Sequence, residues 1–386
     1  MGQGPLAGLK IIEIAGIGPG PFCAMMLADM GADVIRVDRA SGGQPGVQGN
    51  AGKDVLNRGR RSIAVDLKSP DGKALLLQLV ARADGLVEGF RPGVMERLGL
   101  GPEVCHQTNA ALVYGRMTGW GQQGPWAHMA GHDINYIALA GALHAFGRKG
   151  EAPTPPINMV GDFGGGGMLM AFGMVCGLLN AGRTGQGQVI DGAMIDGSAL
   201  LMTMIHAFMA MGIWKDERGV NMLDTGAHFY DVYETSDGKY LAVGSIEPQF
   251  YGELLRLTGL SEDPAFYAQM DRDQWDTLRE RLKVVIKTKT RAQWEEIFEG
   301  SDAGVAPVLS LSEAPNHPHN KARAMFISPG GVPQAAPAPR FSQTPAGTPT
   351  LPPVPGEHSQ EILRDWGVSE PDITRVFETG AVAQAS

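Results

Sequence analysis

Residues 9–38 read LKIIEIAGIGPGPFCAMMLADMGADVIRVD. The apolar run Leu9 to Ile14 predicts a buried strand. A turn rich in Gly and Pro follows from Gly16 to Pro21, and Pro21 suits the first turn of a helix over Phe22 to Met30. Asp33 to Val37 predicts a second strand. Strand, helix and strand within about 30 residues form a βαβ unit, which predicts a parallel sheet.

The alternation of strands and helices continues along the chain. Further strands are expected at 62–67, 85–88 and 112–118, with an amphipathic helix at 72–83. Long helices are expected at 164–180 and within 194–212. This pattern predicts the α/β class, with a doubly wound, Rossmann-like large domain that we assign to residues 1–225.

The pattern changes after residue 225. A β-hairpin is expected at 230–244, because two strand-like runs flank a tight turn at Asp237-Gly238. Two helices and a strand follow, at 250–257, 275–286 and 305–309. Residues 226–325 therefore predict a smaller α+β domain. We expect residues 326–386 to return to the large domain through a Pro-rich segment and to dock there with a helix near 358–366.

Composition narrows the class of protein. A chain of 386 residues predicts two domains. Only 19% of the residues are charged and 54 are Gly. This favours either a large buried surface that includes a subunit interface, or simply a tightly packed core. The net charge of −9 gives no overall attraction for nucleic acid or for an anionic membrane, so we expect neither as a partner.

The cysteines and the apolar segments bear on location. Cys23, Cys105 and Cys176 lie far apart, which argues against a disulfide framework and against zinc. They fit a reducing compartment, and we expect a cytoplasmic protein without a metal site. No basic stretch followed by an apolar run begins the chain, and the apolar stretch Met159 to Leu179 is broken by glycines and Asp162. We therefore expect neither a signal peptide nor a membrane span.

The turn from Gly16 to Pro21 resembles a dinucleotide fingerprint, and Asp38 ends the next strand where such folds bind ribose. The third fingerprint glycine is replaced by Pro21, which removes an amide and argues against a nicotinamide cofactor. Two interpretations remain, a tight turn between strand and helix or a loop that lines an apolar substrate channel.

Basic residues are concentrated between positions 36 and 68. In an acidic chain, such a cluster indicates either a site for a phosphorylated, adenine-bearing ligand or a solvated basic face. Arg91 follows a predicted strand, at the position where these folds usually bind ligands. The clustered residues are Arg36, Arg39, Lys53, Arg58, Arg60, Arg61 and Lys68.

Three further residues are candidates for acid–base chemistry. His132 begins a predicted helix, whose free amides can stabilise an oxyanion and whose dipole favours neutral imidazole. Asp162 precedes the glycines Gly164 to Gly167. Glu247 lies between a predicted strand and a predicted helix, where it could orient a histidine. The alternatives are a structural histidine and two helix-capping carboxylates.

Ten of the 19 methionines lie between Met159 and Met222. They predict either core packing or a flexible surface that binds varied acyl chains.

Short segments in order along almost the whole chain resemble the α-methylacyl-CoA racemases of the family III CoA-transferase (CaiB/BaiF-like) superfamily. This resemblance implies an interlocked homodimer, with each active site between the large domain of one chain and the small domain of its partner. The matching segments are the Gly16–Pro21 turn and residues 36–39, 65–68, 91–93, 131–136, 161–163, 221–224 and 246–251.

The resemblance also implies roles for individual residues. His132 and Asp162 match the two catalytic acid–base residues, and Glu247 matches a carboxylate that supports the histidine. No metal and no cofactor beyond the CoA thioester substrate is implied. The residues implied to hold that thioester are Arg39, Val65, Asp66, Leu67, Lys68 and Arg91, together with Gly131, Asp133, Ile134, Asn135 and Tyr136 beside His132. Thr225 and His228 depart from the racemase pattern, which leaves the acyl pocket and the preferred acyl chain open.

The sequence therefore predicts an isomerase that interconverts (2R)- and (2S)-2-methylacyl-CoA by proton transfer through an enolate. The main alternative is a family III CoA-transferase that carries CoA through an aspartyl intermediate at Asp162. The transferases lack a histidine at the position of His132, so this residue distinguishes the two. A non-catalytic acyl-CoA-binding protein is the third possibility, and the combination of His132, Asp162 and Glu247 argues against it.

Overall fold

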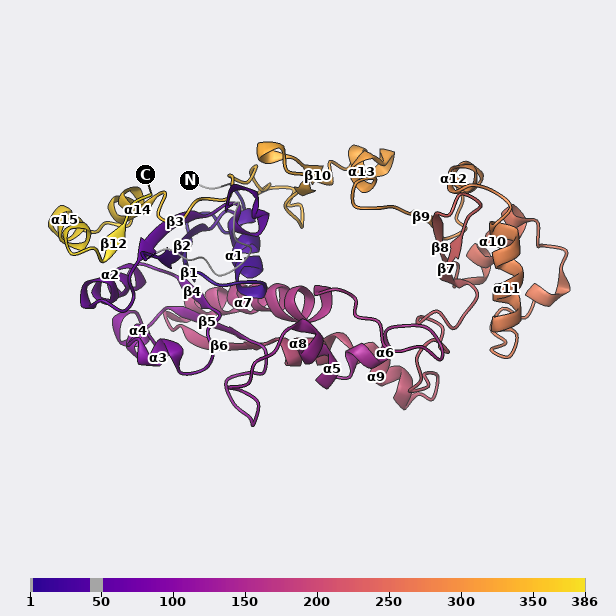
Figure 1. Ribbon diagram of the computed structural model, residues 1–386, viewed down its shortest axis with the longest axis horizontal. Helices are drawn as coiled ribbons and strands as arrows, with labels where there is room; N and C mark the ends of the chain where they lie inside the picture. The colour runs from indigo at the N-terminus through magenta and orange to yellow at the C-terminus, as the bar shows by residue number, and fades with distance from the viewer. Residues whose placement is uncertain (1–2, 42–50, 386) are drawn as a thin grey trace. The chain divides into compact units, whose positions relative to one another are not determined.

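The computed structural model describes residues 3–41 and 51–385 (Figure 1). The chain divides into two compact units. The first unit comprises the described residues of Met1–Ala140, Ile157–Leu201 and Lys321–Ser386, and the second comprises Gly141–Pro156 and Met202–Asn320. The domain boundaries predicted after residues 225 and 325 stay predictions.

A seven-stranded sheet forms the centre of the first unit, in the order β12-β3-β2-β1-β4-β5-β6. The six strands β1 to β6 are parallel, and β12 joins one edge in the antiparallel direction. The predicted α/β class with a mostly parallel sheet is confirmed. The strands are β1 (Lys10–Ile14), β2 (Asp33–Arg39), β3 (Arg61–Val65), β4 (Gly85–Glu88), β5 (Val113–Thr118), β6 (Gln188–Ala193) and β12 (Val382–Ala383).

The strand order reverses between β1 and β4. The order 3-2-1-4-5-6 is that of doubly wound folds, which bind ligands at the carboxyl ends of the strands beside this switch point. Helix α1 (Pro19–Asp29) begins three residues earlier than predicted, because Gly18 adopts φ 68° and Pro19 then starts the first turn. The sequence analysis did not predict β6 or β12.

The remaining helices of the first unit pack around this sheet. Helix α14 returns to β3, where Ile362, Leu363 and Trp366 are fully buried. The helices are α2 (Pro70–Val80), α3 (Val94–Arg97), α4 (Pro102–Thr108), α5 (Asp133–Leu139), α7 (Leu169–Thr184), α8 (Met194–Leu201), α14 (Ser359–Asp365) and α15 (Glu370–Glu378). Shorter elements are the 3₁₀ turns η1 (Ala51–Lys53), η2 (Val55–Asn57) and η6 (Pro329–Gly331), and the ribbon of β10 (Phe326–Ile327) and β11 (Gln334–Ala335).

A π-helix, η3 (Met159–Met168), runs directly into α7. The helix predicted at 164–180 therefore begins five residues earlier and is wider in its first part. It packs against α1, α5 and α8. The approach to α8 is close, because a Cβ added to Gly165 would lie 2.7 Å from the backbone nitrogen of Ser198. Only glycine fits there without a backbone shift.

Together these helices form a long apolar stretch, Met159–Thr184. By length and composition alone it would also suit a membrane span, as core helices of soluble proteins often do. One face of α7 carries Met170, Met174 and Gly177, which are buried in the first unit, where the helix packs on β5 and β6.

The second unit is a small α+β assembly. Its three-stranded antiparallel sheet has the order β7-β8-β9, and β7 and β8 form a hairpin at the predicted positions. Trp294, Phe229 and Leu278 lie in its core. The elements are α6 (Ala142–Ala145), α9 (Thr203–Ala210), β7 (Tyr230–Glu234), β8 (Tyr240–Gly244), α10 (Pro248–Thr258), η4 (Pro264–Phe266), α11 (Trp275–Ile286), α12 (Arg291–Phe298), β9 (Val305–Val308) and η5 (Ala314–Asn316). Helix α13 (Pro318–Ala322) spans the point where the chain leaves this unit.

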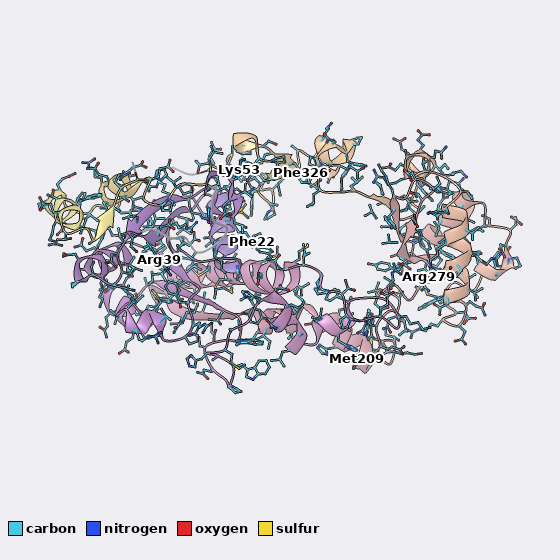
Figure 2. All side chains as sticks on the ribbon, viewed as in Figure 1. Phe22, Arg39, Lys53, Met209, Arg279 and Phe326 are labelled. Atoms are coloured by element: carbon cyan, nitrogen blue, oxygen red, sulfur yellow. The ribbon has the colours of Figure 1, made fainter. Side chains whose placement is uncertain are left out.

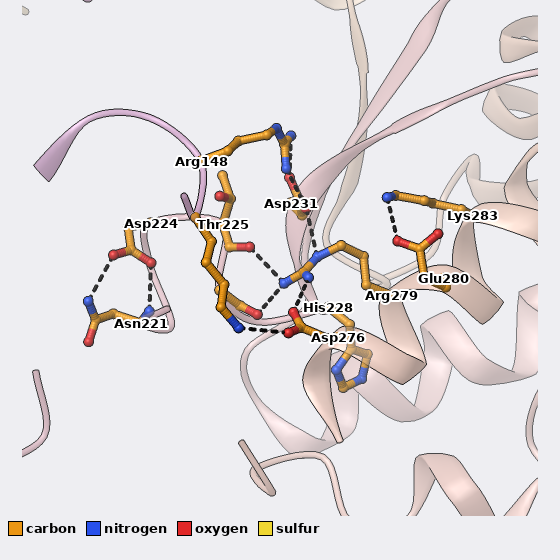
Figure 3. A network of polar contacts seen from close by, with 12 residues as sticks. Arg148, Asn221, Asp224, Thr225, His228, Asp231, Asp276, Arg279, Glu280 and Lys283 are labelled. Carbon is orange, nitrogen blue, oxygen red and sulfur yellow. Dashed lines mark hydrogen bonds and ion pairs between the residues drawn. The ribbon is translucent and has the colours of Figure 1, made fainter. Parts of the chain in front are cut away.

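Figure 3 shows the polar network that ties the second unit together. The buried carboxylate of Asp231 accepts hydrogen bonds from Arg148, at 2.8 and 3.1 Å, and from Arg279, at 3.1 Å. Arg279 also donates to the carbonyl of Thr225 at 2.8 Å, and Thr225 adopts φ 74°. One carboxylate thus joins the segment Gly141–Pro156 to the hairpin and to α11.

His228 lies next to this network and is fully buried. Its Nε2 is 2.7 Å from the hydroxyl oxygen of Tyr251. Burial, and secondly the charge of Arg279, lower the pKa of His228 to about 3. The ring is therefore neutral and enclosed by protein of the second unit.

We predict that His228 makes the protein acid-labile. Because the pKa falls from 6.5 in the unfolded chain to about 3, the unfolded state binds more protons between these values. Stability is lost as the pH falls through this window, by about 2 kcal/mol at pH 5. Urea unfolding at pH 7 and pH 5 should show a smaller loss for His228→Phe than for the parent. The same change at the exposed His319 is the matched control, and an equal loss in all three proteins would contradict the assignment.

Candidate active site

A cavity of about 780 Å³ opens at the carboxyl ends of β1, β4 and β5, beside the switch point of the sheet. The whole turn from Gly16 to Pro21 lines it. The other walls come from the loops after β4 and β5, from the start of α5 and from η3. Lining residues with polar or aromatic side chains are Glu13, Glu88, Phe90, Arg91, Thr118, Trp120, His132, Tyr136, Asn158, Asp162 and Phe163.

His132 is the N-cap residue of α5, with extended backbone angles. Its backbone N–H donates to the side-chain oxygen of Asn135 at 3.0 Å, and the Asn135 N–H donates to the carbonyl of His132 at 2.8 Å. The first bond is one half of a capping box, in which the side chain of the third helical residue accepts the N–H of the N-cap residue, and the second closes the first turn. Together they fix the His132 backbone and leave the imidazole exposed at the cavity.

Asp162 lies in the first turn of η3 and is half-buried. Its carboxylate accepts a hydrogen bond from the Asn158 side chain at 3.0 Å. The turn from Gly16 to Pro21 passes close to this carboxylate, because a Cβ added to Gly18 would lie 3.5 Å from Oδ2 of Asp162. Asp162 is not the helix cap, because Asn158 holds the N-cap position of η3.

The environment raises the pKa of Asp162 above its usual value. Burial is the largest cause; the Asn158 hydrogen bond opposes it, the charge of Asp133 adds to it and His132 opposes it. A carboxyl with a raised pKa can hold a proton closer to neutral pH, as an acid in catalysis must.

Tyr136 forms the wall next to His132. Its hydroxyl donates to the carbonyl of Gly131, and its ring meets Trp120 edge-on at 4.7 Å between centroids. Burial and the charge of Asp162 raise the pKa of Tyr136 to about 12. The side chain is therefore a neutral hydrogen-bond donor that orders the loop before the helix.

Glu88 is a buried acid in the cavity wall that the sequence analysis missed. Its carboxylate accepts the Phe90 N–H at 2.7 Å and a bond from Arg116 at 3.2 Å, which orders the loop that carries Arg91. Burial raises its pKa to about 7, against the effects of the Phe90 and Arg116 hydrogen bonds. The sequence signal that could have identified Glu88 is an acidic residue at the end of an apolar strand.

A comparison with protein families now identifies this architecture. The family model for CoA-transferase family III matches residues 6–359. The chain belongs to this family. It is 47% identical over 373 residues to "Alpha-methylacyl-CoA racemase" of Mus musculus, covering 96% of both chains, and 46% identical over 371 residues to the Homo sapiens protein of that name, covering 95% of both. A solved CAIB/BAIF family protein from Brucella suis has a TM-score of 0.79 at 28% identity, covering 94% of this chain and 100% of that one.

In this family III chain, the structure brings five of the predicted site residues to one cavity. They are Arg91, Gly131, His132, Tyr136 and Asp162. Asp133 and Asn135 lie directly behind the lining, where they bond to Asp162 and His132, and Ile134 is exposed on α5. Glu247 is exposed at the N-cap of α10 in the second unit and makes no capping bond with its side chain.

The other residues predicted to hold CoA lie at the carboxyl ends of β2 and β3. Arg39 ends β2 and pairs with Val65 at the end of β3, so the turn Asp66–Lys68 follows beside it. Figure 2 labels Arg39, whose side chain is exposed like that of Lys68. Val65 is buried in the core, while Asp66 and Leu67 are half-buried. These five residues do not line the cavity itself.

The structure corrects the interpretation of the basic cluster. Three of its arginines are buried in ion pairs, Arg36 with Asp38 at 3.2 Å, Arg58 with Asp29 at 2.6 Å and Arg60 with Glu13 at 3.0 Å. Arg61 binds Asp33, Glu361 and Asp365. These side chains hold the fold together, so neither a ligand site nor a solvated face describes them. Arg39, Lys53 and Lys68 remain exposed.

In the described ranges, 3–41 and 51–385, no group of three or more His, Cys, Asp or Glu side chains could hold a metal ion. The expected absence of a metal site stays a prediction.

We predict that Asn158→Ala raises the pKa of Asp162 further, because the hydrogen bond that stabilises the carboxylate is lost. Carbon-13 NMR titration of labelled aspartates measures this, and Asp162→Asn identifies the resonance. Asn320→Ala, which removes a comparable side-chain donor in the second unit, is the control. An unchanged or lower pKa in Asn158→Ala would disprove the role given to this bond.

Proposed function

We propose that this chain is an α-methylacyl-CoA racemase that interconverts (2R)- and (2S)-2-methylacyl-CoA. The observation that carries the proposal is the meeting of His132 and Asp162 in one cavity, in a chain 47% identical to a racemase over nearly its whole length. Two acid–base groups in one cavity suit a reaction that removes a proton on one face of a carbon and returns it on the other.

The chemistry follows from the thioester. Its carbonyl acidifies the α-hydrogen, because the carbanion formed on deprotonation delocalises into an enolate. Neutral His132 takes the α-proton of one enantiomer, and protonated Asp162 donates a proton to the opposite face. In the reverse direction, the Asp162 carboxylate is the base and the His132 imidazolium is the acid. The raised pKa of Asp162 supports both roles.

The enolate oxygen needs hydrogen-bond donors. Helix α5 begins directly after His132, so its first backbone N–H groups, from Asp133 onward, lie at the same end of the helix. We propose these groups as the oxyanion donors. We further propose that Arg39, Val65–Lys68 and Arg91 hold the CoA part, since all of them lie at or just after the carboxyl ends of β2, β3 and β4 in one parallel sheet.

A second copy of the chain is the partner that we propose. The outer face of α7, together with Met168 at the end of η3, exposes a row of apolar side chains. Met168, Phe172, Val175 and Leu179 are 52, 66, 40 and 58% exposed. An apolar face of this kind is typical of a subunit interface. We propose an interlocked homodimer in which Glu247 of one chain supports His132 of the other. We also propose a cytoplasmic enzyme that needs no cofactor beyond its CoA thioester substrate.

The competing function is CoA transfer with Asp162 as the nucleophile. It is supported by the family and by the position of the Asp162 carboxylate at the cavity. It gives no acid–base role to His132, which stands at the same cavity.

We predict that the purified protein, given one enantiomer of a 2-methylacyl-CoA in deuterium oxide without an acceptor acid, incorporates deuterium and loses optical purity. His132→Ala and Asp162→Ala should each lower racemisation by about 10²–10⁴-fold. Each variant should still exchange the α-proton of one enantiomer, the one that its remaining base addresses, with opposite preferences. Chiral chromatography with mass spectrometry measures both.

A transferase would behave differently in the same experiment. The parent protein would be inert until an acceptor acid is added, Asp162→Ala would lose all activity and His132→Ala would be little affected. Racemisation within about threefold of the parent in His132→Ala would also defeat the two-base mechanism, since a general base contributes far more.

The dimer proposal has its own test. We predict that co-expressed His132→Ala and Glu247→Ala chains, each inactive alone, restore one complete site in every mixed dimer. Random pairing then yields about one quarter of the parent activity. A fully active monomer at high dilution, or no recovery in purified mixed dimers, would contradict an active site shared between chains.

A further inference from the structure

The two acid–base residues are connected by the side chain of Asp133. His132 ends the loop before α5, Asp133 is the first residue of that helix, and Asp162 lies in the first turn of η3. Oδ1 of Asp133 accepts the backbone N–H of Asp162 at 2.7 Å. A residue adjacent to His132 in sequence is therefore bonded to the main chain of Asp162.

The neighbourhood of this bond leaves little freedom. Asp133 is only 5% exposed. A Cβ added to Gly161 would lie 2.6 Å from Oδ1 of Asp133, so any side chain at position 161 would displace this carboxylate or the chain before Asp162. The contact between α5 and η3 is thus held by the Asp133 side chain on α5 and by the close approach of Gly161 on η3.

The second oxygen of Asp133 is the unusual feature. Oδ2 is buried and has no hydrogen-bond partner among the described residues. A buried carboxylate oxygen left unbonded is costly, and such groups often have a functional reason. No ion pair to Asp133 is found within the described chain either, so its negative charge acts on its neighbours.

We propose that the Asp133 side chain is a positioning residue, which holds the main chain of Asp162 beside His132 and places a second negative charge next to the Asp162 carboxyl. This inference rests on the proposed racemase function. It gives the Asp133 side chain a task separate from the backbone N–H of the same residue.

The effect of removing the Asp133 charge on the pKa of Asp162 depends on the other charged and titratable groups around Asp162. His132 and Asp133 face it from α5, as does the neutral Tyr136, with Arg91 beyond Tyr136 from the loop after β4. Asn158 donates from the start of η3. Of these groups, Asp133 is the one whose charge favours the protonated form of Asp162.

The decisive variant is Asp133→Asn, which keeps an oxygen that can accept the Asp162 N–H but removes the charge. Its bell-shaped profile of kcat/KM against pH should move to lower pH, by about one unit in the sum of the two apparent pKa values. Asp133→Ala also removes the acceptor, and kcat should fall about tenfold further than in Asp133→Asn, with KM for the thioester within about threefold of the parent. A purely structural role would lower stability without moving the pH profile.

Two other variants complete the test. Asp84→Asn is the matched control, since the Asp84 carboxylate also accepts a backbone N–H, from Lys10, at 2.7 Å. Asp84 lies at the amino ends of the strands, away from the cavity, so the pH profile of this variant should equal that of the parent. Gly161→Ala displaces the Asp133 carboxylate without changing its charge, so kcat should fall about tenfold at constant KM even if Asp133 variants fold poorly. A parent-like profile in Asp133→Asn, or a parent-like kcat in Gly161→Ala, overturns the inference. Absence of racemisation in the parent protein overturns the proposed function instead.

Discussion

Close approach of backbone to backbone at the glycine run Gly164–Gly167 is the constraint on which the site depends. Added Cβ atoms would lie 2.7 Å from the backbone nitrogen of Ser198 at Gly165, and 2.7 Å from the carbonyl oxygen of Pro19 at Gly167. The π-helix η3 therefore lies directly on α8 and α1. Because α1 begins in the turn that lines the cavity, this contact determines how far Asp162 stands from that turn. Larger residues would push the helix, and with it the carboxyl, away.

A parallel sheet concentrates chemistry at one edge, and this chain uses that edge throughout. The turn after β1, Glu88 and Arg91 at β4, and the loop that leads from β5 to His132 all meet at the cavity. Burial raises the pKa values of Asp162, Tyr136 and Glu88, and the charges of neighbouring acids in the site add to this effect at Asp162 and Tyr136. A site rich in acids suits an enzyme that must hold and release protons near neutral pH.

The arginines near the N-terminus serve two purposes: several pair with acids in the interior, whereas Arg39 is exposed and is proposed to hold CoA. Side chains alternate between the faces of a strand, so Arg36 and Asp38 of β2 lie on the same face and pair in the interior, while Arg39 follows on the other. Arg58 and Arg60 lie in the turn before β3, and their side chains also enter the interior, where they pair with Asp29 and Glu13. Removing one partner of such a buried pair leaves an uncompensated charge, so these arginines are a condition of the fold.

The sequence by itself determined the local elements and the candidate acid–base residues. Apolar runs, Gly-Pro turns and helical periodicity predicted β1, α1, β2, the hairpin and α11, and the setting of His132 and Asp162 was visible as a helix start and a glycine run. Only the tertiary structure decided which buried arginines pair, that Glu88 lines the cavity, that β6 and β12 join the sheet, and that Asp133 reaches Asp162. The physical reason is distance along the chain. Periodicity reports which face of an element is buried, whereas contacts such as Asp133 to Asp162, 29 positions apart, and Ala64 to Ala383, 319 positions apart, follow from strand order and packing.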